Sequence, residues 1–214
     1  MAKTEKTTIS EADILKHLKK VDPLLYKAAL PHRGMVLPRA QPKRSNNELF
    51  KSLVSSIVSQ QLSTKAAASI FARLVMTVGG KLTPKTIVET PDAALRTAGL
   101  SAAKVKSLKE LSQTIQNGEL NLLKLRTNTS EEAVTKLSSI WGIGPWTAEM
   151  FLIFALGSPD VYSSGDLILV RMLESLHGLP VGTLKTELEQ RAAVWSPYRS
   201  YGSLLLWRLN DQKK

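Results

Sequence analysis

Apolar residues recur along most of this chain at intervals of three and four positions, which is the spacing of one face of an α-helix. The clearest example covers residues 48–78, where Leu49, Leu53 and Ile57 fall on one face. A break at residues 60–63 divides this stretch into two predicted helices. No stretch alternates with period two for long enough to predict a strand. The pattern therefore predicts an all-α protein of about ten short helices.

Residues that favour helix starts support this division. Ser10, Thr83 and Ser101 each precede a predicted helix, and Asp22 is followed by a proline that suits the first helical turn. Residues 31–47 contain several prolines and polar residues instead, so we interpret them as a connector between helices.

The most informative segment is a glycine-rich turn between two predicted helices, Trp141-Gly-Ile-Gly-Pro-Trp146. Gly142 and Gly144 can adopt a positive φ without a Cβ clash, and Pro145 fits the first turn of the helix that follows. A helix that begins here presents backbone N–H groups, which together with the helix dipole bind phosphate. We therefore expect the backbone around Gly142, Ile143 and Gly144 to bind a phosphate. The alternative is a turn that only joins two helices.

The charge balance indicates which kind of partner carries such phosphates. The chain has 29 Lys and Arg residues against 18 Asp and Glu, which gives a formal net charge of +11 and a pI near 9.9. This excess favours a polyanionic partner, with nucleic acid first and an acidic membrane second. A generically basic protein without such a partner is the alternative.

The cysteine and histidine content excludes several kinds of chemistry. The chain has no cysteine, so disulfides, thiol catalysis and cysteine-ligated zinc or iron–sulfur clusters are excluded. His17, His32 and His177 are scattered, so we expect surface or capping histidines and no metal site. No apolar run approaches the ~20 residues of a membrane span, and the polar N-terminus lacks the apolar segment of a signal peptide. We therefore expect a soluble, intracellular protein.

Five segments resemble, in the same order, the helix-hairpin-helix DNA glycosylases, and among these the alkylbase branch (3-methyladenine DNA glycosylase II), most closely its yeast-type members. The segments are residues 57–62, 98–104, 141–148, 165–166 and 195–207. The resemblance implies an all-α, two-lobed fold with the active cleft between the lobes. It places the hairpin and a DNA-inserting wedge in a central lobe at residues 46–157, and it joins residues 1–45 with 158–214 in a second lobe.

The resemblance further implies an enzyme of base excision repair that excises alkylated purines, such as 3-methyladenine and 7-methylguanine, from DNA. Trp146 stands where family members that also cut the strand carry a nucleophilic lysine. A tryptophan cannot form a Schiff base, which predicts base release without a lyase step.

Asp166, twenty residues after Trp146 and just before an apolar run, is the predicted catalytic residue. A buried carboxylate can stabilise the cationic sugar of the transition state and orient the attacking water. Its alternative role is to cap the next helix, and the two roles are compatible. Arg171 is expected to pair with phosphate or with Asp166 itself.

An everted base needs a pocket, and the resemblance places tryptophans of that pocket at Trp146 and Trp207. Met150 and Tyr162 complete the predicted pocket, although Met150 stands where the bacterial relative has a tyrosine. Aromatic faces would hold a base that alkylation has made electron-poor. Packing in the core is the alternative for most aromatic residues of this region.

Leu62, at the break between two predicted helices, is the predicted wedge, because an apolar side chain can fill the gap that a flipped nucleotide leaves. Gln60 and Gln61 beside it are expected to contact the minor groove or the orphaned base. A buried leucine at a helix end is the alternative. The remaining predicted DNA-binding residues are Ser63, Lys104, Gly142, Ile143, Gly144, Thr147 and Arg171.

By the same resemblance, a monovalent cation, Na+ or K+, is expected at the hairpin carbonyls of Ile140 and Gly142, and no other cofactor is expected. The expected partner is double-stranded DNA that carries an alkylated base or an abasic site, bound by a monomer without membrane contact. The predicted compartment is the nucleus in a eukaryote and the cytoplasm otherwise.

Two other functions remain open. A protein of the same fold could bind abasic or distorted DNA without excising bases. Three departures from the family favour it: Ser63 after the wedge, Met150 in the pocket, and residues 163–165 before Asp166. The different residues at 163–165 could misplace the carboxylate of Asp166, and a displacement of ~1 Å can lower the rate ~100-fold. A basic RNA-binding or ribosome-associated helical protein would explain the charge but not the order of hairpin and aspartate.

Overall fold

The computed structural model describes residues 10–34 and 44–212, and its regular elements in this part of the chain are all helical. Twelve α-helices, two 3₁₀ turns and one π-helical turn follow one another, without a strand among the described residues. The all-α prediction is confirmed. The predicted connector at residues 31–47 falls partly outside the described residues, since residues 35–43 are not among them. None of the helices in the described ranges is long and apolar enough to cross a membrane.

The chain divides into two compact units. The first, which we call the central unit, is Ala40–Ser158, and the second, the terminal unit, combines Met1–Arg39 with Pro159–Lys214. The sequence places the lobe boundaries at residues 46 and 157. Each unit carries part of the predicted site, because the hairpin and the wedge lie in the central unit and Asp166 lies in the terminal unit.

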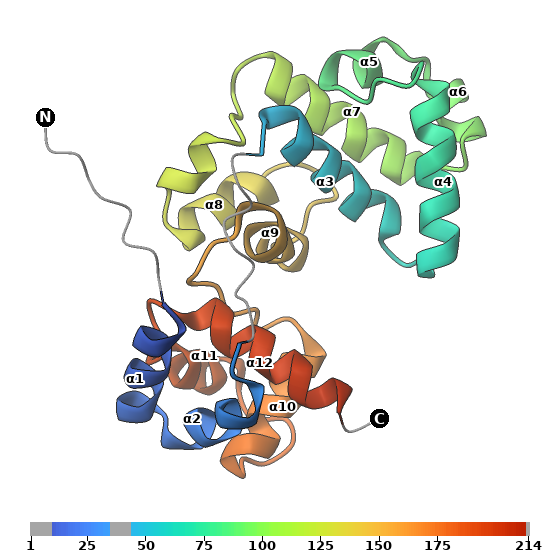
Figure 1. Cartoon of the computed structure of the whole chain (residues 1–214). Coiled ribbons are helices and arrows are strands. Elements are labelled where there is room, and N and C mark those ends of the chain that lie inside the picture. Colours follow the sequence, from blue (N-terminus) through green and yellow to red (C-terminus); the bar gives the residue numbers. More distant parts are fainter. Residues whose placement is uncertain (1–9, 35–43, 213–214) are drawn as a thin grey trace, which may run out of the picture. The chain divides into compact units, whose positions relative to one another are not determined.

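The central unit is built around one apolar helix. Its α-helices are α3 (Asn46–Ser59), α4 (Thr64–Thr77), α5 (Pro84–Glu89), α6 (Asp92–Thr97), α7 (Ala102–Gln116), α8 (Ser130–Ser138) and α9 (Pro145–Phe151), with a 3₁₀ turn η2 (Lys124–Thr127) and a π-helical turn η3 (Leu152–Leu156). Helix α3 packs against α4, α7 and α9 (Figure 1). Its buried residues are Leu49, Phe50, Leu53, Val54, Ile57 and Val58. Each such side chain stabilises the fold by about 1.5–3 kcal/mol.

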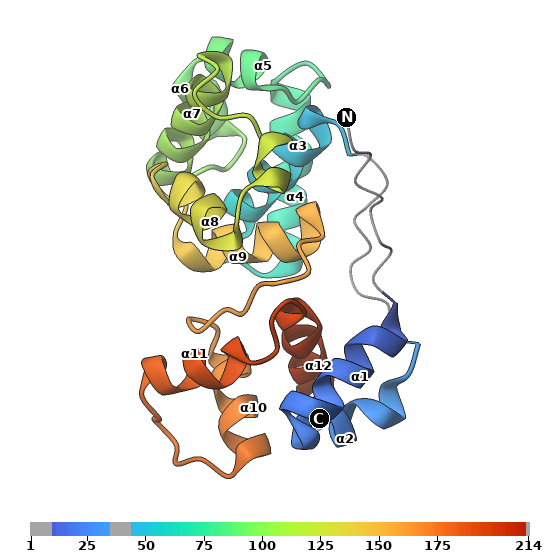
Figure 2. The same cartoon turned by 90° about the vertical axis from the view of Figure 1, so that its left-hand side faces the viewer.

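The terminal unit has its own core. Its helices are α1 (Glu11–Val21), α2 (Pro23–Ala29), α10 (Leu167–His177), α11 (Lys185–Ala193) and α12 (Arg199–Asp211), with a 3₁₀ turn η1 (Leu30–His32). Helix α10 packs against α2, α11 and α12, and Figure 2 shows these helices together with α1. Trp195 and Tyr201 are fully buried in this core. Core packing, the alternative for the aromatic residues, therefore applies to both.

Local capping chemistry sets the helix starts. The side chains of Ser10, Thr83 and Ser101 accept hydrogen bonds from the first turns of α1, α5 and α7, as their sequence positions predict. The predicted break at residues 60–63 separates α3 from α4, and Ser63 caps α4 through the backbone N–H of Ala66. These local signals fix the elements on which the site is built.

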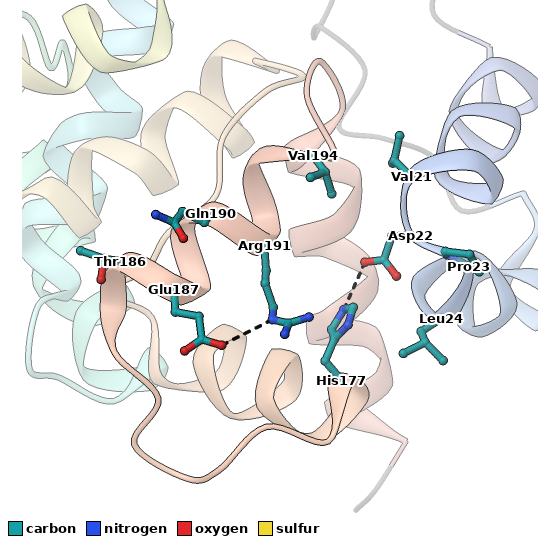
Figure 3. Close-up of a pocket in the computed structure, with 10 residues that line it drawn as sticks. All are labelled: Val21, Asp22, Pro23, Leu24, His177, Thr186, Glu187, Gln190, Arg191 and Val194. Carbon is teal, nitrogen blue, oxygen red and sulfur yellow. Dashed lines mark ion pairs between the residues drawn. The ribbon is translucent and has the colours of Figure 1, made fainter.

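A buried carboxylate, Asp22, joins three parts of the terminal unit. Its Oδ1 accepts a hydrogen bond from the backbone N–H of Leu25 at 3.0 Å, and its Oδ2 accepts one from Nε1 of Trp195 at 2.8 Å. Nε2 of His177 lies 3.1 Å from the same Oδ2, beside a pocket of about 770 Å³ that α2, α10 and α11 line (Figure 3). The expectation of a surface or capping histidine is wrong for His177, because its side chain is only 10% exposed and faces Asp22. A surface position is also wrong for His32, which is buried.

This network predicts a pH dependence of stability. Burial raises the pKa of Asp22, but hydrogen bonds from His177, Leu25 and Trp195 outweigh it, so that the pKa lies below its ordinary value. A carboxyl group whose pKa falls on folding stabilises the fold above its unfolded pKa, and this contribution is lost as the pH falls through the folded pKa. We therefore expect wild type to lose stability between about pH 5 and pH 2 more steeply than Asp22→Asn. At pH 7 the variant should be about 2 kcal/mol less stable, because Trp195 and His177 lose their acceptor.

Urea unfolding across this pH range measures both effects. The control is Glu187→Gln, because Glu187 only forms an exposed pair with Arg191 at 3.8 Å in the same pocket wall. Such surface pairs contribute about 0–1 kcal/mol, so this variant should follow wild type. Identical acid profiles for wild type and Asp22→Asn would contradict the role of Asp22.

Candidate active site and DNA interface

The glycine turn forms a hairpin between α8 and α9, as predicted. The backbone N–H of Ile143 donates to the carbonyl of Ile140 at 3.1 Å, and Gly142 has a φ of 82°. Gly144 is the N-cap of α9 and supplies no side chain to its first turn, where Pro145 follows. The first-turn N–H groups of α9 therefore have no side-chain cap from this position, which is what a phosphate-binding helix start requires.

The hairpin is fixed by α7. A Cβ atom on Gly142 would overlap the hydroxyl of Ser107, so the hairpin backbone touches α7 directly. The backbone N–H of Trp141 donates to Oε1 of Glu110 at 2.8 Å, and Nζ of Lys106 lies 4.5 Å from the centre of the Trp141 ring. A cation held over an exposed indole beside the hairpin adds positive charge next to the predicted phosphate site.

The wedge loop, which we define as residues 59–63, is a tight turn between α3 and α4. The backbone N–H of Leu62 donates to the carbonyl of Ser59 at 3.1 Å, and Gln61 has a φ of 57°. A positive φ is uncommon in a residue with a side chain and costs of order 1 kcal/mol. Leu62 is 38% exposed, so the alternative of a buried leucine does not hold. The turn presents Leu62 to solvent, as a wedge requires.

Three side chains that are predicted to bind DNA contact other parts of the protein. Nε2 of Gln60 donates to the carbonyl of Gly142 at 3.1 Å and to Oγ1 of Thr147 at 3.3 Å. Thr147 is only 5% exposed. Nζ of Lys104 donates to the carbonyls of Val58 and Gln60 at 2.7 and 2.9 Å, and burial lowers its pKa. The polar groups of these side chains hold the wedge loop and the hairpin in place, and Ser63 likewise serves as a helix cap.

Asp166 lies at the start of α10, where its side chain is 9% exposed. Its Oδ1 accepts hydrogen bonds from the backbone N–H groups of Ile168 and Leu169 at 3.0 and 3.1 Å. Nε1 of Trp207 donates to the same oxygen at 3.3 Å. Asp166 therefore caps the helix as the alternative reading states, and the donors orient the carboxylate beside the Trp207 indole.

The segment that leads to Asp166 is anchored to α12 by residues that the sequence analysis did not assign. Asp160 accepts from Nε of Arg199 at 2.8 Å and from the hydroxyl of Ser196 at 2.7 Å. The backbone N–H of Val161 donates to the hydroxyl of Ser200 at 3.0 Å. These bonds fix the chain at residues 160 and 161, six and five positions before Asp166. The signal available in the sequence was the polar cluster at residues 196–200, whose partners no local pattern reveals.

The segment itself, residues 163–165, is also held. Ser163 is fully buried, and its carbonyl accepts from the backbone N–H of Asp166 at 3.2 Å. The hydroxyl of Ser164 donates to Oε1 of Glu189 at 2.6 Å. The departure from the family at these positions therefore does not leave the approach to Asp166 without anchors.

The remaining predicted pocket residues fall in different surroundings. Tyr162 is 9% exposed and packs edge-on against Trp195 in the core of the terminal unit, with ring centroids 5.8 Å apart. Burial, followed by the negative charges of Asp166, Glu189 and Glu174, raises its pKa. Its ring packs in this core, and its assignment to the base pocket stays a prediction. Trp146 is 47% exposed on α9, where Met150 is partly buried, and Arg171 is exposed on α10.

The structure brings two groups of predicted residues together. In the central unit, the wedge loop and the hairpin are joined by Gln60. In the terminal unit, Asp166 and Trp207 share a hydrogen bond. A glycine hairpin between two helices, α8 and α9, in a chain whose described elements are all helical is the arrangement of helix-hairpin-helix proteins.

Comparison with known proteins narrows this class. A family model described as "HhH-GPD superfamily base excision DNA repair protein" matches residues 54–197, which is more than half of the chain. The chain belongs to the HhH-GPD superfamily of base excision DNA repair proteins. The resemblance noted from the sequence is therefore confirmed.

Relatives of this chain carry a consistent description. Over 173 residues it is 33% identical to DNA-3-methyladenine glycosylase 1 of Schizosaccharomyces pombe, covering 78% of this chain and 76% of that protein. It is similar to the crystal structure of a DNA-3-methyladenine glycosidase from Bacillus halodurans, with a TM-score of 0.81, 36% identity, and coverage of 92% of this chain and 89% of that one. The 3-methyladenine DNA glycosylase of S. pombe in complex with abasic DNA gives a TM-score of 0.70, 28% identity, and coverage of 91% and 95%.

Proposed function

We propose that this protein is a monofunctional DNA glycosylase of base excision repair that releases alkylated purines, of the 3-methyladenine and 7-methylguanine type, from duplex DNA. Membership of the superfamily and relatives named DNA-3-methyladenine glycosylases support the substrate class. The observation that carries the chemistry is the carboxylate of Asp166, which is buried, oriented by three donors, and bonded to the Trp207 indole.

The reaction breaks the bond between C1′ of the sugar and the base nitrogen. The electron pair of this bond leaves with the base, and a water molecule adds to C1′ and gives one proton to the carboxylate of Asp166, which passes it to solvent. Because the sugar becomes cationic in the transition state, the negative charge of Asp166 stabilises it and its oxygen accepts a hydrogen bond from the water. A purine alkylated at a ring nitrogen is positively charged and leaves as a neutral base, so little help from a general acid is needed. Trp146, in place of a lysine, provides no amine for a lyase step.

DNA binding rests on the central unit in this proposal. The backbone of the hairpin binds a phosphate, and Leu62 fills the gap that the flipped nucleotide leaves. Trp207, which donates to Asp166, is a proposed face against the base, and Trp146 stays a candidate from the sequence. A carbonyl oxygen has two lone pairs, so the carbonyls of Ile140 and Gly142 could hold Na+ or K+ in addition to their hydrogen bonds from Ile143 and Gln60.

The protein acts as a monomer on duplex DNA in this proposal. Its compartment follows from its source, with the nucleus proposed for a eukaryote and the cytoplasm otherwise.

A base-release assay on methylated duplex DNA, run beside a binding assay on abasic DNA at ~150 mM salt, tests the function. We expect release of methylated purines together with tight, specific binding of the abasic duplex. Abasic binding without release of any alkylated base would identify a damage-binding protein and refute excision. Preference for single-stranded RNA over damaged duplex DNA would refute both and favour the RNA-binding alternative.

A further inference from the structure

We propose that Gln60 and Lys104 are positioning residues that couple the wedge loop to the hairpin, so that DNA held at the hairpin places Leu62 in the base stack. This inference rests on the proposed function, because it assigns the wedge and the hairpin to DNA. It differs from the sequence prediction, in which both side chains contact DNA directly. Four contacts within the central unit carry it.

The first contact is a side-chain brace across the loop. Nε2 of Gln60 reaches the hairpin carbonyl of Gly142 at 3.1 Å and Oγ1 of Thr147, in the first turn of α9, at 3.3 Å. The two residues lie 82 and 87 positions further along the chain. Both donor hydrogens of the amide can therefore be used inside the protein, which leaves this group without a donor for a base edge.

The second contact holds the backbone of the wedge loop. Nζ of Lys104 donates to the carbonyl of Val58, at the end of α3, and to the carbonyl of Gln60 in the loop. The last carbonyls of a helix lack partners within it and carry the negative end of its dipole, so an ammonium group stabilises them. Lys104 thereby fixes the strained turn at Gln61.

The third and fourth contacts come from the same helix. Ser107 abuts Gly142, and Oε1 of Glu110 accepts from the backbone N–H of Trp141 at 2.8 Å. Lys104, Ser107 and Glu110 are spaced by three, so they lie near one another along α7. Helix α7 thus contacts both the wedge loop and the hairpin, and Gln60 bonds the two directly to each other. Movement of one is transmitted to the other through these bonds.

Helix α7 also offers a matched control. Nζ of Lys109 donates to the carbonyls of Val88 and Thr90, at 2.9 and 2.6 Å, at the end of α5. Lys109→Met therefore removes the same charge and the same kind of helix-end bond as Lys104→Met, together with an ion pair to Asp92 at 3.5 Å, and all of these contacts lie away from the wedge loop. A change at the wedge loop that appears in Lys104→Met and not in Lys109→Met therefore depends on where the lysine binds.

The test without DNA is the hydrogen exchange of the Leu62 amide, which donates to Ser59 within the loop. We expect exchange about tenfold faster in Lys104→Met and Gln60→Met than in wild type. In Lys109→Met the rate of this amide should stay unchanged. Equal rates at Leu62 in all four proteins would overturn the proposal.

The test with DNA is a double-mutant cycle on the affinity for an abasic duplex. In wild type and in Lys109→Met, Leu62→Ala should weaken binding about tenfold, whereas in Gln60→Met and Lys104→Met it should weaken binding less than about twofold, because an unplaced wedge contributes little. If the losses of affinity from the single variants simply multiplied in the double variants, the residues would contact DNA independently and the proposal would be overturned. It would also be overturned if Leu62→Ala had no effect on the affinity of the wild-type protein. If the cycle showed coupling but the protein released no base, the proposed excision would be refuted and the coupling would stand.

Discussion

Asp166→Asn should lower the rate of base release from methylated duplex DNA by at least about 100-fold. The substitution removes the negative charge that stabilises the cationic sugar and leaves a side chain of nearly the same shape. The affinity for an abasic duplex should change by less than about twofold, because the proposed function assigns binding to the hairpin and the wedge. Single-turnover release of methylated bases and binding of abasic DNA, measured on the same preparations, separate the two effects.

The capping role of Asp166 makes asparagine the informative replacement. Asparagine caps helices about as well as aspartate, so the bonds from Ile168 and Leu169 survive and thermal unfolding should match wild type. Asp166→Ala, in contrast, should lose about 1 kcal/mol of stability with the cap. If Asp166→Asn released bases at the wild-type rate, the carboxylate would be a cap alone and the proposed chemistry would be wrong.

Gly142→Ala should disrupt the hairpin. The residue has a φ of 82°, which costs an L-residue about 1–2 kcal/mol. Its new Cβ would also overlap the side chain of Ser107, an overpacking effect of about 1–3 kcal/mol. We expect the free energy of unfolding to fall by about 3 kcal/mol and the affinity for abasic DNA to fall at least about tenfold, since the phosphate-binding backbone must shift. Denaturant unfolding and abasic-DNA titrations measure the two losses.

Gly144→Ala is the matched control two residues away. Its φ is −81°, and a Cβ atom there meets nothing within 4 Å, so its stability should stay near that of wild type. Ser107→Gly removes the overlap but has its own cost as a glycine within α7. Measured against Ser107→Gly alone, Gly142→Ala should therefore cost only the positive φ, about 1–2 kcal/mol. Equal stabilities of Gly142→Ala and Gly144→Ala would show that the close approach to Ser107 is not a constraint.

The sequence predicts the elements of the site because their signals are local. Ser63 before α4 and the glycines between α8 and α9 act within a few residues, so spacing and residue type suffice to predict them. Asp166 at the start of α10 belongs to the same group, and its burial fits the apolar run that follows it.

The roles of Gln60 and Lys104 could not be predicted in the same way. A polar residue beside a wedge looks alike in sequence whether it contacts DNA or the protein. Only the fold shows that Gln60 meets a carbonyl 82 residues away and that Lys104 meets one 46 residues away. The ion pair between Asp160 and Arg199, which lie 39 residues apart, could not be predicted for the same reason.

The cleft between the two lobes, which the family resemblance implies, stays a prediction.

The lysines of α7 also affect how the DNA affinity of this protein depends on salt. Ammonium groups that donate to backbone carbonyls, as Lys104 and Lys109 do, neutralise no phosphate and release no condensed counterions when a duplex binds. The slope of log affinity against log salt reports the cations that contact phosphates, so we expect these two of the 29 Lys and Arg residues not to add to it. If the proposed function holds, charge read from composition should overstate the ionic share of DNA binding, and the uncharged backbone donors of the hairpin and Leu62 should supply more of the affinity.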